Sequence, residues 1–419
     1  MVTEQIITKS DQKQTYVERI PKDWKIVQVG DHFNFKNGLN KAKKFFGQGT
    51  PIINYMNVYP YPEIYEKYIQ GKVTLTNGEL RTFDIRKGDV LFTRTSETLN
   101  EIGLSSVVLD DVKKTVFSGF LLRARPTTDL FGLEFKKYCF RSKNVRRQII
   151  STSSKTTRAL TNGKLLSKVS VLIPINQYEQ LAISESISDI EKCIKQLDYL
   201  IEKKKNIKQG AIQEFLTGTK RLDGFNEKWI FTKLDEVAEM FSGGTPLTSN
   251  RSYYDGNIPW VIITDITKAK KYLYSTEKNI TQQGLESCSA KIFQKGVLLF
   301  AMYASIGKCC IAKIDVTCNQ AILGIVTKKI DTEFLYQHMV FSEKRFSQMG
   351  QTGTQNNLNK EMVQNLDIPY PHIDEQIAIG KILSDMDVEI NELEKNRDKY
   401  VMIKNGMMQK LLTGEIRLK

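Results

Sequence analysis

The sequence predicts an α+β fold in which two strand-rich domains are joined by a long antiparallel two-helix coiled coil. Three observations predict it: a segment near the middle of the chain recurs at its C-terminal end, both copies space their apolar residues as helices do, and the parts between them contain many short apolar runs typical of strands. At 419 residues the chain is long enough for two or three domains. The repeat therefore predicts two equivalent halves related by an internal pseudo-two-fold axis.

The repeat aligns without a gap. The Glu-Gln pair at 179–180 recurs at 375–376, and the Leu-Thr-Gly triplet at 216–218 recurs at 412–414, so the offset is 196 residues throughout. Upstream of each copy the similarity is looser and its offset drifts. We infer that the upstream parts share a fold but have diverged in sequence, as two domains with different targets would.

Each copy of the repeat has apolar residues spaced alternately four and three residues apart, the pattern of a coiled-coil seam. The predicted seam consists of Ile183, Ile187, Ile190, Ile194, Leu197 and Ile201 in the first helix and Ile379, Leu383, Met386, Ile390 and Leu393 in the second. The glycine of each Leu-Thr-Gly triplet is suited to end its helix in the left-handed conformation. Because the chain passes from the first helix into the second globular part before it reaches the second helix, the two seams bury each other only if the helices are antiparallel.

The same pattern predicts the domain boundaries. We expect an N-terminal extension at 1–19, a first domain at 20–174, a first helix with its linker at 175–224, a second domain at 225–369, and a second helix with the C-terminal tail at 370–419. Apolar runs that follow a glycine turn, such as GDVLF and GVLLF, and runs ended by proline, such as VSVLIP, predict strands. We expect them to form a central, partly barrel-like sheet in each domain.

Charge and composition narrow the choice of partners. Lys plus Arg number 61 against 47 Asp plus Glu, and the net charge of +14 favours polyanions, with nucleic acid first and anionic membrane second. No apolar stretch approaches the 18 or so residues of a membrane span, and the N-terminal residues lack the order of a signal peptide, so we expect a cytoplasmic protein without a membrane. With six cysteines, three histidines and no CxxC pair, we expect reduced thiols and no metal site.

Motifs of catalysis are missing from the sequence. It has no GxxxxGK[ST] loop for a triphosphate, and neither the glycine-rich cofactor loop nor the Asn-Pro-Pro type motif of a DNA methyltransferase. Its serines, cysteines and histidines show no spacing that supports a catalytic triad. The sequence therefore predicts a protein that binds and does not catalyse.

Residues 136–168 carry ten positive side chains and no acidic one. Such a run is typical of a surface that binds phosphates, although a solvated basic helix face is the ordinary alternative. We expect Lys143, Arg146 and Arg147 to act mainly on phosphates. Since phosphate contacts carry no sequence information, specificity has to come from other residues.

Polar loops rich in Arg, Asn, Gln and Thr are candidates for reading base edges, because their donors and acceptors match those of the major groove. An ordinary turn in which Asn or Thr caps its own backbone is the alternative for each. The candidates are Arg94, Thr95, Ser96, Thr98, Asn100, Lys155, Thr156, Thr157 and Arg158 in the first domain, and Thr245, Thr248, Ser249, Asn250, Arg251, Tyr303, Ser305, Lys308, Thr354, Gln355, Asn356 and Asn357 in the second.

Several of these motifs together resemble a known family. The order GGTP, IPW, a Gly-Asp-Val-Leu-Phe type strand, TQNNLN, IPYPHIDEQ and a long helix ending in LLTGEIRL is similar to that of the specificity subunit of type I restriction-modification enzymes. The resemblance covers 17–419 and is closer in the second half. In the first half NGLNKAKKFFGQGTPIIN stands in place of the GGTP segment, and KTTRALTNGK in place of TQNNLNK.

The resemblance implies a non-catalytic subunit that recognises double-stranded DNA. Each globular part would be a target recognition domain for one half of a bipartite, asymmetric target, and the helices would set the spacer and dock two modification subunits that carry S-adenosylmethionine and methylate adenine. Two restriction subunits with ATP-driven translocation and a Mg-dependent nuclease would complete the complex, and this chain itself would hold no cofactor. The alternative is a non-enzymatic coiled-coil scaffold whose globular ends bind proteins.

Overall fold

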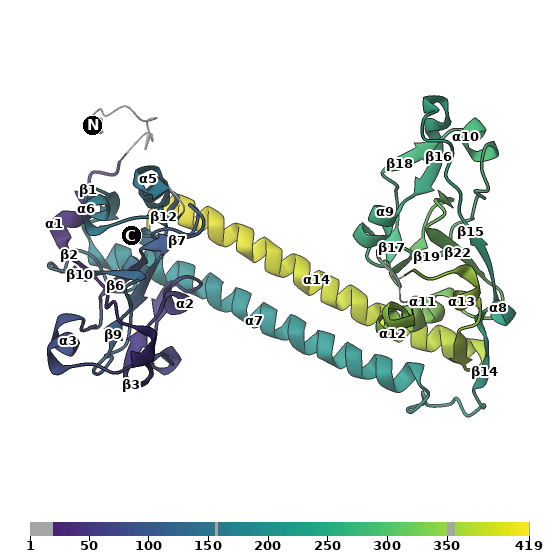
Figure 1. Ribbon diagram of the computed structural model, residues 1–419, viewed down its shortest axis with the longest axis horizontal. Coiled ribbons are helices and arrows are strands. Elements are labelled where there is room, and N and C mark those ends of the chain that lie inside the picture. Colours follow the sequence, from purple (N-terminus) through teal and green to yellow (C-terminus); the bar gives the residue numbers. More distant parts are fainter. Residues whose placement is uncertain (1–19, 156–157, 350–356, 419) are drawn as a thin grey trace. The chain divides into compact units, whose positions relative to one another are not determined.

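The computed structural model describes residues 20–155, 158–349 and 357–418. Contacts divide the chain into two compact units, the first ending at Gln196 and resuming at Asn396, and the second comprising Leu197–Lys395. Each unit therefore contains one globular domain and half of each long helix (Figure 1). This division cuts through both helices because each half-helix packs against its nearer domain. The domain boundaries expected from the sequence remain predictions, and the extension at 1–19 lies outside the described residues.

Two long helices are the repeated segments. Helix α7 comprises the 40 residues Gln177–Leu216, and α14 the 39 residues Ile373–Leu411. Just beyond them Gly218 and Gly414 have φ angles of +69° and +72°, the left-handed conformation that favours glycine. A Cβ atom at Gly218 would lie 3.2 Å from the ring of Trp229, so the close approach of the ring also requires a small residue. Both helices and their glycine ends are confirmed as predicted.

Ion pairs show that the helices are antiparallel within each unit. In the first unit Glu191 of α7 lies 3.4 Å from Lys404 near the end of α14. In the second unit Lys208 near the end of α7 pairs with Asp387 of α14. The two pairs are related by the repeat offset of 196 residues, so the chain makes the same interhelical contact twice.

The predicted seam is buried to different degrees along its length. Fully buried are Ile183, Ile187, Ile201, Ile379, Leu383 and Ile390, and partly buried are Ile190, Ile194, Leu197, Met386 and Leu393. At its ends the seam does more than join two helices. Ile183 and Ile187 belong to one apolar cluster with Leu411 of α14 and the domain residues Phe135 and Tyr138. The helices are therefore built into the domain cores.

A buried ion pair explains why the Glu-Gln and Leu-Thr-Gly ends recur together. Arg417, which follows α14, donates to both carboxylate oxygens of Glu179 at 2.6 and 2.8 Å and to Asp23 at 2.8 Å. In the second unit Arg221, which follows α7, donates to Glu375 at 2.7 and 2.6 Å. These hydrogen bonds raise the pKa of Arg417. Since a buried carboxylate is costly without a partner, each helix start depends on the residue that follows the other helix.

The glutamine of each Glu-Gln pair connects the helix to its domain. Gln180 donates from Nε2 to the carbonyl of Pro174 at 2.8 Å, while its Oε1 accepts from the backbone nitrogen of Gly132 at 2.7 Å. Gln376 donates to the carbonyl of Pro371 and accepts from the backbone nitrogen of Asp331, both at 2.8 Å. Both amides are fully buried, and their hydrogen bonds fix the position at which each domain ends and its long helix begins.

In the first domain the entering strand β1 (Trp24–Gln28) pairs antiparallel with the leaving strand β13 (Ser170–Pro174). The main sheet has five strands in the order β2 (Phe33–Asn37), β10 (Leu121–Pro126), β6 (Val90–Thr93), β8 (Ser105–Val108) and β4 (Glu63–Ile64). Two three-stranded sheets are formed by β5 (Lys72–Val73), β3 (Phe46–Ile53) and β9 (Val116–Phe117), and by β11 (Ser154–Lys155), β12 (Ala159–Leu160) and β7 (Thr95–Ser96). The helices are α1 (Val29–His32), α2 (Tyr55–Val58), α3 (Asn77–Thr82), α4 (Phe135–Cys139), α5 (Lys143–Thr152) and α6 (Gly163–Ser167), with short 3-10 turns at Lys43–Phe45 and Glu66–Tyr68.

The second domain repeats this plan. Strand β14 (Ile230–Lys233) pairs with β23 (Asp367–Tyr370). The main sheet has the order β15 (Ala238–Ser242), β22 (Ile322–Thr327), β19 (Leu298–Ala301), β20 (Cys309–Ala312) and β17 (Tyr272–Leu273), and a smaller sheet has the order β18 (Lys278–Ile280), β16 (Tyr254–Val261) and β21 (Thr317–Cys318). The helices are α8 (Leu234–Val237), α9 (Ile263–Lys268), α10 (Gln282–Glu286), α11 (Thr332–Phe341), α12 (Glu343–Met349) and α13 (Lys360–Gln364), with a 3-10 turn at Arg251–Tyr253.

The strands predicted from apolar runs are present. GDVLF and GVLLF form β6 and β19, each after a glycine with positive φ, Gly88 at +87° and Gly296 at +99°. The expectation of a partly barrel-like sheet is wrong for the described residues, because the five-stranded sheets are open, with β2 and β4 as the outer strands in one and β15 and β17 in the other. The two-strand pairs and smaller sheets complete each domain instead.

Candidate nucleic-acid interface

The topology of the second domain brings its polar loops together at one end of the main sheet. Ser242 at the end of β15 pairs with Leu323, and Ala301 at the end of β19 pairs with Ile322, both at the start of β22. Antiparallel neighbours of one strand end where that strand begins. The loops 243–251, 302–308 and 319–321 therefore emerge side by side, and we call them the second loop cluster.

Backbone contacts explain the two glycines of the GGTP segment. A Cβ atom at Gly243 would lie 2.1 Å from the carbonyl oxygen of Cys318, and one at Gly244 would lie 2.4 Å from the backbone nitrogen of Ala290. No other residue fits without displacing backbone. The nitrogen of Gly244 also donates to the carbonyl of Cys318 at 2.9 Å. The two glycines thus allow the loop 243–251 to cross closely over the backbone that precedes β22.

The first domain uses the same arrangement. Asn37 at the end of β2 pairs with Leu122, and Thr93 at the end of β6 pairs with Leu121 of β10. A Cβ atom at Gly38 would lie 2.0 Å from the carbonyl oxygen of Ser118, as at Gly243 in the other domain. The NGLN segment therefore performs the backbone role of GGTP although its sequence differs.

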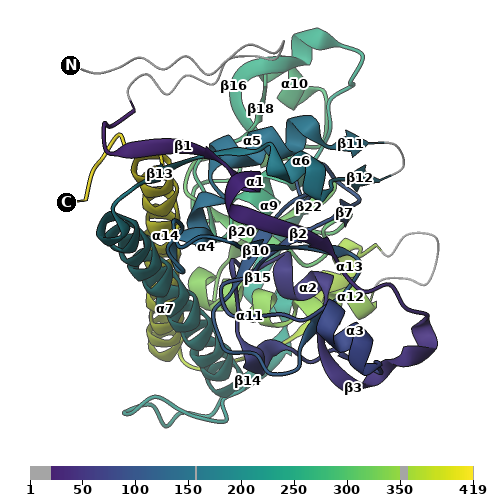
Figure 2. The ribbon, with the colours of Figure 1, turned by 90° about the vertical axis from the view of Figure 1, so that its left-hand side faces the viewer.

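Two candidate loops of the first domain that are 60 residues apart in sequence form one small sheet. Strand β7 pairs with β12, which pairs with β11, so 94–100 lies beside 154–155 and 158–160 (Figure 2). The backbone nitrogen of Thr161 also donates to the carbonyl of Arg94 at 3.1 Å. We call these segments the first loop cluster. The sequence marked both loops but not their pairing.

Within the first loop cluster the candidates divide by exposure. Thr98, Asn100 and Arg158 are exposed, whereas Arg94 and Thr95 are half-buried. Ser96 is buried, and its hydroxyl donates to Glu101 at 2.8 Å, so it shapes the loop and does not reach its surface. The side chain of Lys155, and Thr156 and Thr157 as a whole, lie outside the described residues.

In the second loop cluster the exposed candidates are Thr248, Ser249, Arg251 and Lys308, and the half-buried ones are Thr245, Asn250, Tyr303 and Ser305. Asn357, outside this cluster, is also half-buried. Asn250 accepts from the backbone nitrogen of Ser252 at 3.1 Å, the self-capping turn that was the alternative interpretation. Lys308 lies 2.9 Å from Glu343, which neutralises part of its charge. Thr354, Gln355 and Asn356 lie outside the described residues.

The acid-free run is less of a phosphate surface than its composition suggested. Lys136 donates to the carbonyl of Gly88, Lys137 pairs with Glu63 at 2.6 Å, and the side chain of Arg141 donates to the carbonyl of Ser105 at 2.7 Å. Burial lowers the pKa of Arg141 to about 10. These cations find acceptors in distant parts of the domain, so they hold the interior together.

Adjacent arginines of α5 have different surroundings. Arg146 donates to the carbonyls of Ile102 at 2.6 Å and Asn100 at 2.9 Å, and burial lowers its pKa to about 10. Two of its nitrogens thus hold carbonyls in and next to the first loop cluster, and the expectation that Arg146 acts mainly on phosphates stays a prediction. Arg147 is exposed. Lys143 is also exposed, and its amine lies 3.1 Å from the side-chain oxygen of Gln409 on α14.

Two residues beside the candidate interface were not identified from the sequence. Phe120 is 56% exposed, and its carbonyl accepts from the backbone nitrogen of Arg94 at 2.9 Å, which places it beside the first loop cluster. Gln320 accepts from the hydroxyl of Thr245 in the second. Both stand just before the strand that pairs with GDVLF or GVLLF. The sequence could have indicated both residues. GDVLF and GVLLF are each followed later in the chain by a second apolar run, and pairing the two runs as neighbouring strands places the residues just before the second run next to the loop that follows the first.

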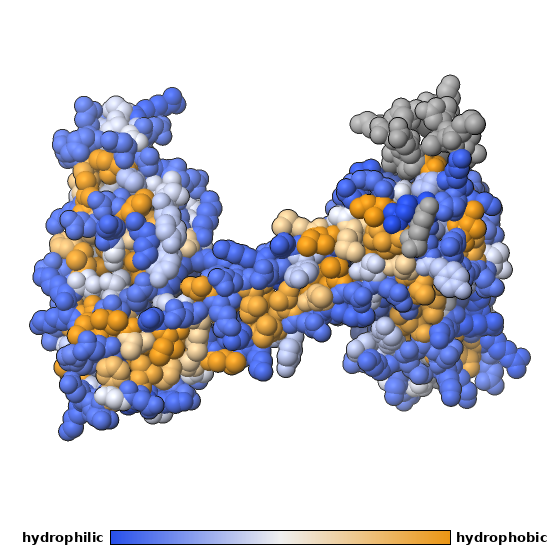
Figure 3. Space-filling view, turned by 180° about the vertical axis from the view of Figure 1, so that it is seen from behind, coloured by the Kyte–Doolittle hydropathy of each residue, from blue (hydrophilic) through white to orange (hydrophobic). Residues whose placement is uncertain are grey.

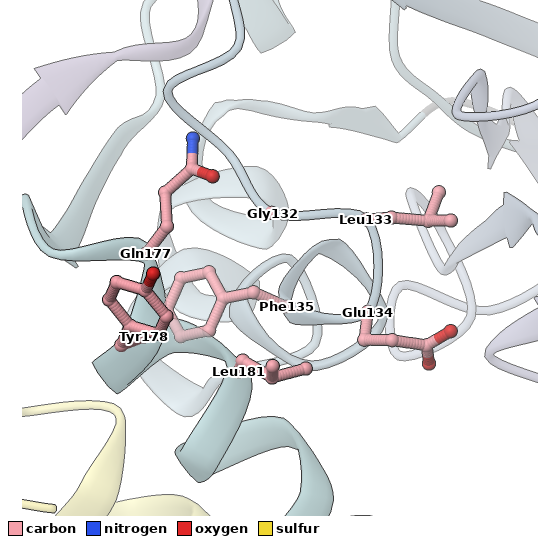
Figure 4. Close-up of a pocket in the computed structure, with 7 residues that line it drawn as sticks. All are labelled: Gly132, Leu133, Glu134, Phe135, Gln177, Tyr178 and Leu181. Atoms are coloured by element: carbon pink, nitrogen blue, oxygen red, sulfur yellow. The ribbon is translucent and has the colours of Figure 1, made fainter.

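A separate pocket lies where α7 begins. It is lined by Gly132, Leu133, Glu134, Phe135, Gln177, Tyr178 and Leu181. Figure 4 shows the side chains of Phe135, Tyr178 and Leu181 lying together at the helix start. Tyr178 is 83% exposed and Leu181 is 46% exposed, so the pocket continues into an open apolar surface.

Residues suited to a resident metal are not gathered anywhere in 20–155, 158–349 or 357–418, where no group of three or more His, Cys, Asp and Glu side chains could hold an ion. All six cysteines are free. In the same ranges no helix is long and apolar enough to span a membrane.

The different surroundings of Arg146 and Arg147 lead to a test with neighbouring substitutions. Arg147→Ala should weaken binding to all DNA sequences about equally and lower the slope of log affinity against log salt by about 0.9, because one phosphate contact is lost. Arg146→Ala should leave two loop carbonyls without donors, destabilise the fold by about 1–3 kcal/mol and reduce discrimination between sequences.

DNA titrations at several salt concentrations, with denaturant unfolding of each variant, measure both effects. Arg146→Lys is the control, because lysine keeps the charge but cannot make the two-pronged contact. Full recovery of sequence discrimination by Arg146→Lys would show that charge alone matters and would contradict the loop-support role.

Comparisons with known proteins agree with this organisation. Residues 226–401 match the family model described as the type I restriction modification DNA specificity domain. The MjaVIII type I restriction enzyme specificity subunit of Methanocaldococcus jannaschii is 22% identical over 434 residues, covering 97% of this chain and 96% of that protein. The MjaIX specificity subunit of the same organism is 32% identical over 177 residues, but the match spans 41% of this chain and 40% of that protein.

Solved structures share the fold. The S subunit of a type I restriction-modification system from M. genitalium has a TM-score of 0.58 at 14% identity, covering 95% of this chain and 98% of that chain. The HsdS subunit from Thermoanaerobacter tengcongensis has a TM-score of 0.51 at 17% identity, covering 96% and 99%. At these identities the likeness establishes the fold alone. The match of the family model to 226–401 and the similarity over nearly the whole chain to a named specificity subunit show that this chain is similar to the specificity subunits of type I restriction-modification enzymes.

Proposed function

We propose that this chain is the specificity subunit of a type I restriction-modification enzyme, and that its two domains each read one half of a bipartite, asymmetric sequence in double-stranded DNA. The observation that carries the proposal is that two equivalent sheets present loop clusters of different sequence at the same end. Two domains with the same backbone arrangement but different loop side chains are suited to reading two half-sites that differ in sequence. As a recognition subunit the chain is not itself an enzyme.

The exposed residues divide between two kinds of contact. Arg147, Lys164 and Lys168 are exposed cations of the first domain and would contact phosphates, which supplies affinity and its salt dependence. Arg158 in the first loop cluster and Arg251 in the second are exposed on loops and would contact base edges, where a good bidentate pair discriminates by about 1–3 kcal/mol.

The helices supply the second part of the proposed function, the fixed gap between half-sites. Helix α7 has 40 residues, which corresponds to about 60 Å at 1.5 Å per residue. Both helices continue from one unit into the other. A continuous helix pair of this length is a suitable spacer, because its length changes only when residues are added or removed.

We further propose that two modification subunits dock on exposed apolar residues that recur at the repeat offset. Leu181 and Ile377 are equivalent and 46% and 51% exposed, and Ile207 and Ile403 are equivalent and also exposed. Figure 3 shows apolar side chains at the surface of the helices among polar ones. Two copies of one partner require two copies of the same binding surface. The repeated helices provide such a pair of surfaces, whereas the loops differ in sequence between the domains and do not.

The pocket at the start of α7 borders Leu181 and would accept an apolar side chain of the partner. In this scheme S-adenosylmethionine belongs to the modification subunits, and ATP and Mg to two restriction subunits, so that this chain holds no cofactor. One further structural neighbour, with a TM-score of 0.59 at 16% identity over 95% of this chain and 100% of that one, was solved to explain complex assembly of the type I restriction-modification system. The complex would act in the cytoplasm.

Independent reading is tested by single substitutions in the two loop clusters. Arg158→Ala should relax discrimination at one position of one half-site, and Arg251→Ala at one position of the other, each by about 1–3 kcal/mol. Methylome sequencing of cells that carry each variant with the modification subunit identifies the altered position. Changes in both half-sites from one substitution would contradict two separate readers, and protein-binding ends without DNA affinity would favour the scaffold alternative.

Docking is tested by stoichiometry. Leu181→Asp should remove one of two bound modification subunits, and so should Ile377→Asp, because a charge in an apolar contact is poorly solvated. Val388→Asp is the matched control: Val388 is 54% exposed on α14, but its equivalent is Lys192, so it is not part of a repeated surface. Native mass spectrometry of the complex gives the ratio directly. A 1:2 complex formed by Leu181→Asp would exclude this surface.

A further inference from the structure

One carboxylate of α7 in the first unit contacts two other elements at once. The hydroxyl of Tyr138, on α4 of the domain, donates to Glu191 of α7 at 3.0 Å. The amine of Lys404, on α14, lies 3.4 Å from the other oxygen of Glu191. Tyr138 is 1% exposed, so its hydroxyl meets Glu191 at the inner boundary between domain and helix. Glu191 therefore connects the domain to its own helix and to the opposite helix.

The second unit makes the equivalent connection with a different donor. The side-chain nitrogen of Gln337, on α11, donates to Asp387 of α14 at 3.1 Å, and Lys208 of α7 pairs with the other oxygen of Asp387. Gln337 is fully buried. Asp387 is Glu191 shifted by 196 residues, and Lys208 shifted likewise is Lys404. The carboxylate and the lysine recur, whereas the domain donor has changed from a hydroxyl to an amide.

Other polar contacts reinforce each connection. In the first unit Glu63 of the domain lies 2.6 Å from Lys137 and 3.6 Å from Lys195 of α7. In the second unit Glu333 of α11 lies 2.6 Å from Lys271 and accepts from the hydroxyl of Ser384 of α14 at 3.4 Å. Both domains thus meet the helices through charged groups as well as apolar ones.

These polar contacts are directional, whereas the apolar packing between domain and helix is not. Apolar contact between a domain and a helix is not directional and tolerates small rotations. Hydrogen bonds to an ionised group are short, strong and directional, so they favour one orientation. Burial, and then the charge of Glu191, raise the pKa of the Tyr138 hydroxyl, so it stays protonated and remains the donor.

We propose that Glu191 and Asp387 are positioning residues that fix the angle of each recognition domain on the helix pair. A fixed angle restricts the complex to one gap length between the half-sites. This inference rests on the proposed function, in which the helices hold two readers on one DNA duplex. It adds that the accuracy of the gap depends on two side chains that connect each domain to both helices.

The test removes each carboxylate in the full chain, assembled with its modification subunits. Glu191→Ala and Asp387→Ala should lower the preference for the wild-type gap over a gap one base pair longer or shorter by on the order of tenfold, the effect of one or two lost hydrogen bonds. The half-site sequences themselves should stay the same. Methylation rates on duplexes that differ only in gap length measure this preference.

Matched controls use exposed acids of the same helices. Glu185→Ala on α7 and Glu392→Ala on α14 remove a charge from an exposed position and should keep the wild-type preference. Tyr138→Phe removes only the domain hydroxyl, keeps the buried ring, and should relax the preference in the same way as Glu191→Ala.

The outcomes are distinguishable. A preference unchanged in both Glu191→Ala and Tyr138→Phe would overturn the proposal, and if Glu191→Ala does not fold, Tyr138→Phe decides alone. Equal relaxation in the control variants would also overturn it. A wild-type complex that methylates no bipartite sequence would instead contradict the proposed function, without reference to these carboxylates.

Discussion

Pairing of two amphipathic helices is the interaction on which the rest of this protein depends. Each helix carries its apolar residues on one stripe, and exposing that stripe to water would cost about 25 cal/mol per Å². The helices can bury it only against each other and against the two domains. Their antiparallel direction follows from the order of the chain, and it brings the end of each helix to the start of the other.

Ion pairs at both ends of the helix pair connect the start of each helix to the segment that follows the other helix. Glu179 and Glu375 are buried at the helix starts, and each is neutralised by the arginine that follows the opposite helix, Arg417 or Arg221. A fragment with only one helix would leave such a carboxylate unpaired, and this is strongly destabilising for a buried acid. Each compact unit therefore needs both copies of the repeat.

Rigid frames and variable loops have separate roles in each domain. Gly38 and Gly243 permit the same backbone crossing in the two domains. Arg146 donates to the carbonyls of Asn100 and Ile102 and so holds the first loop cluster in place. These residues determine where a loop lies, and both glycines are buried. The exposed side chains, such as Arg158 and Arg251, can differ between the domains because the frames do not depend on them.

The sequence predicted the helices, their direction and many strands, because these depend on local spacing and on the order of the chain. It could not separate Arg146 from Arg147, since neighbouring residues on a helix point about 100° apart and only the tertiary fold decides which one faces inward. The acid-free run was misleading for a similar reason. Three of its cations, Lys136, Lys137 and Arg141, are satisfied by carbonyls and by Glu63, which are far away in sequence. The pairing of β7 with β12 is likewise a long-range contact that no local pattern encodes.

If the helix pair holds two readers at a set distance, lengthening both helices together should change that distance. Four residues inserted after Gln196 and four after Lys395, where the two units divide, add about one turn, or roughly 6 Å, and coiled coils tolerate an insertion of four. Methylome sequencing should then show unchanged half-sites separated by one or two more base pairs, at about 3.4 Å per base pair. Retained methylation with an unchanged gap would contradict the claim.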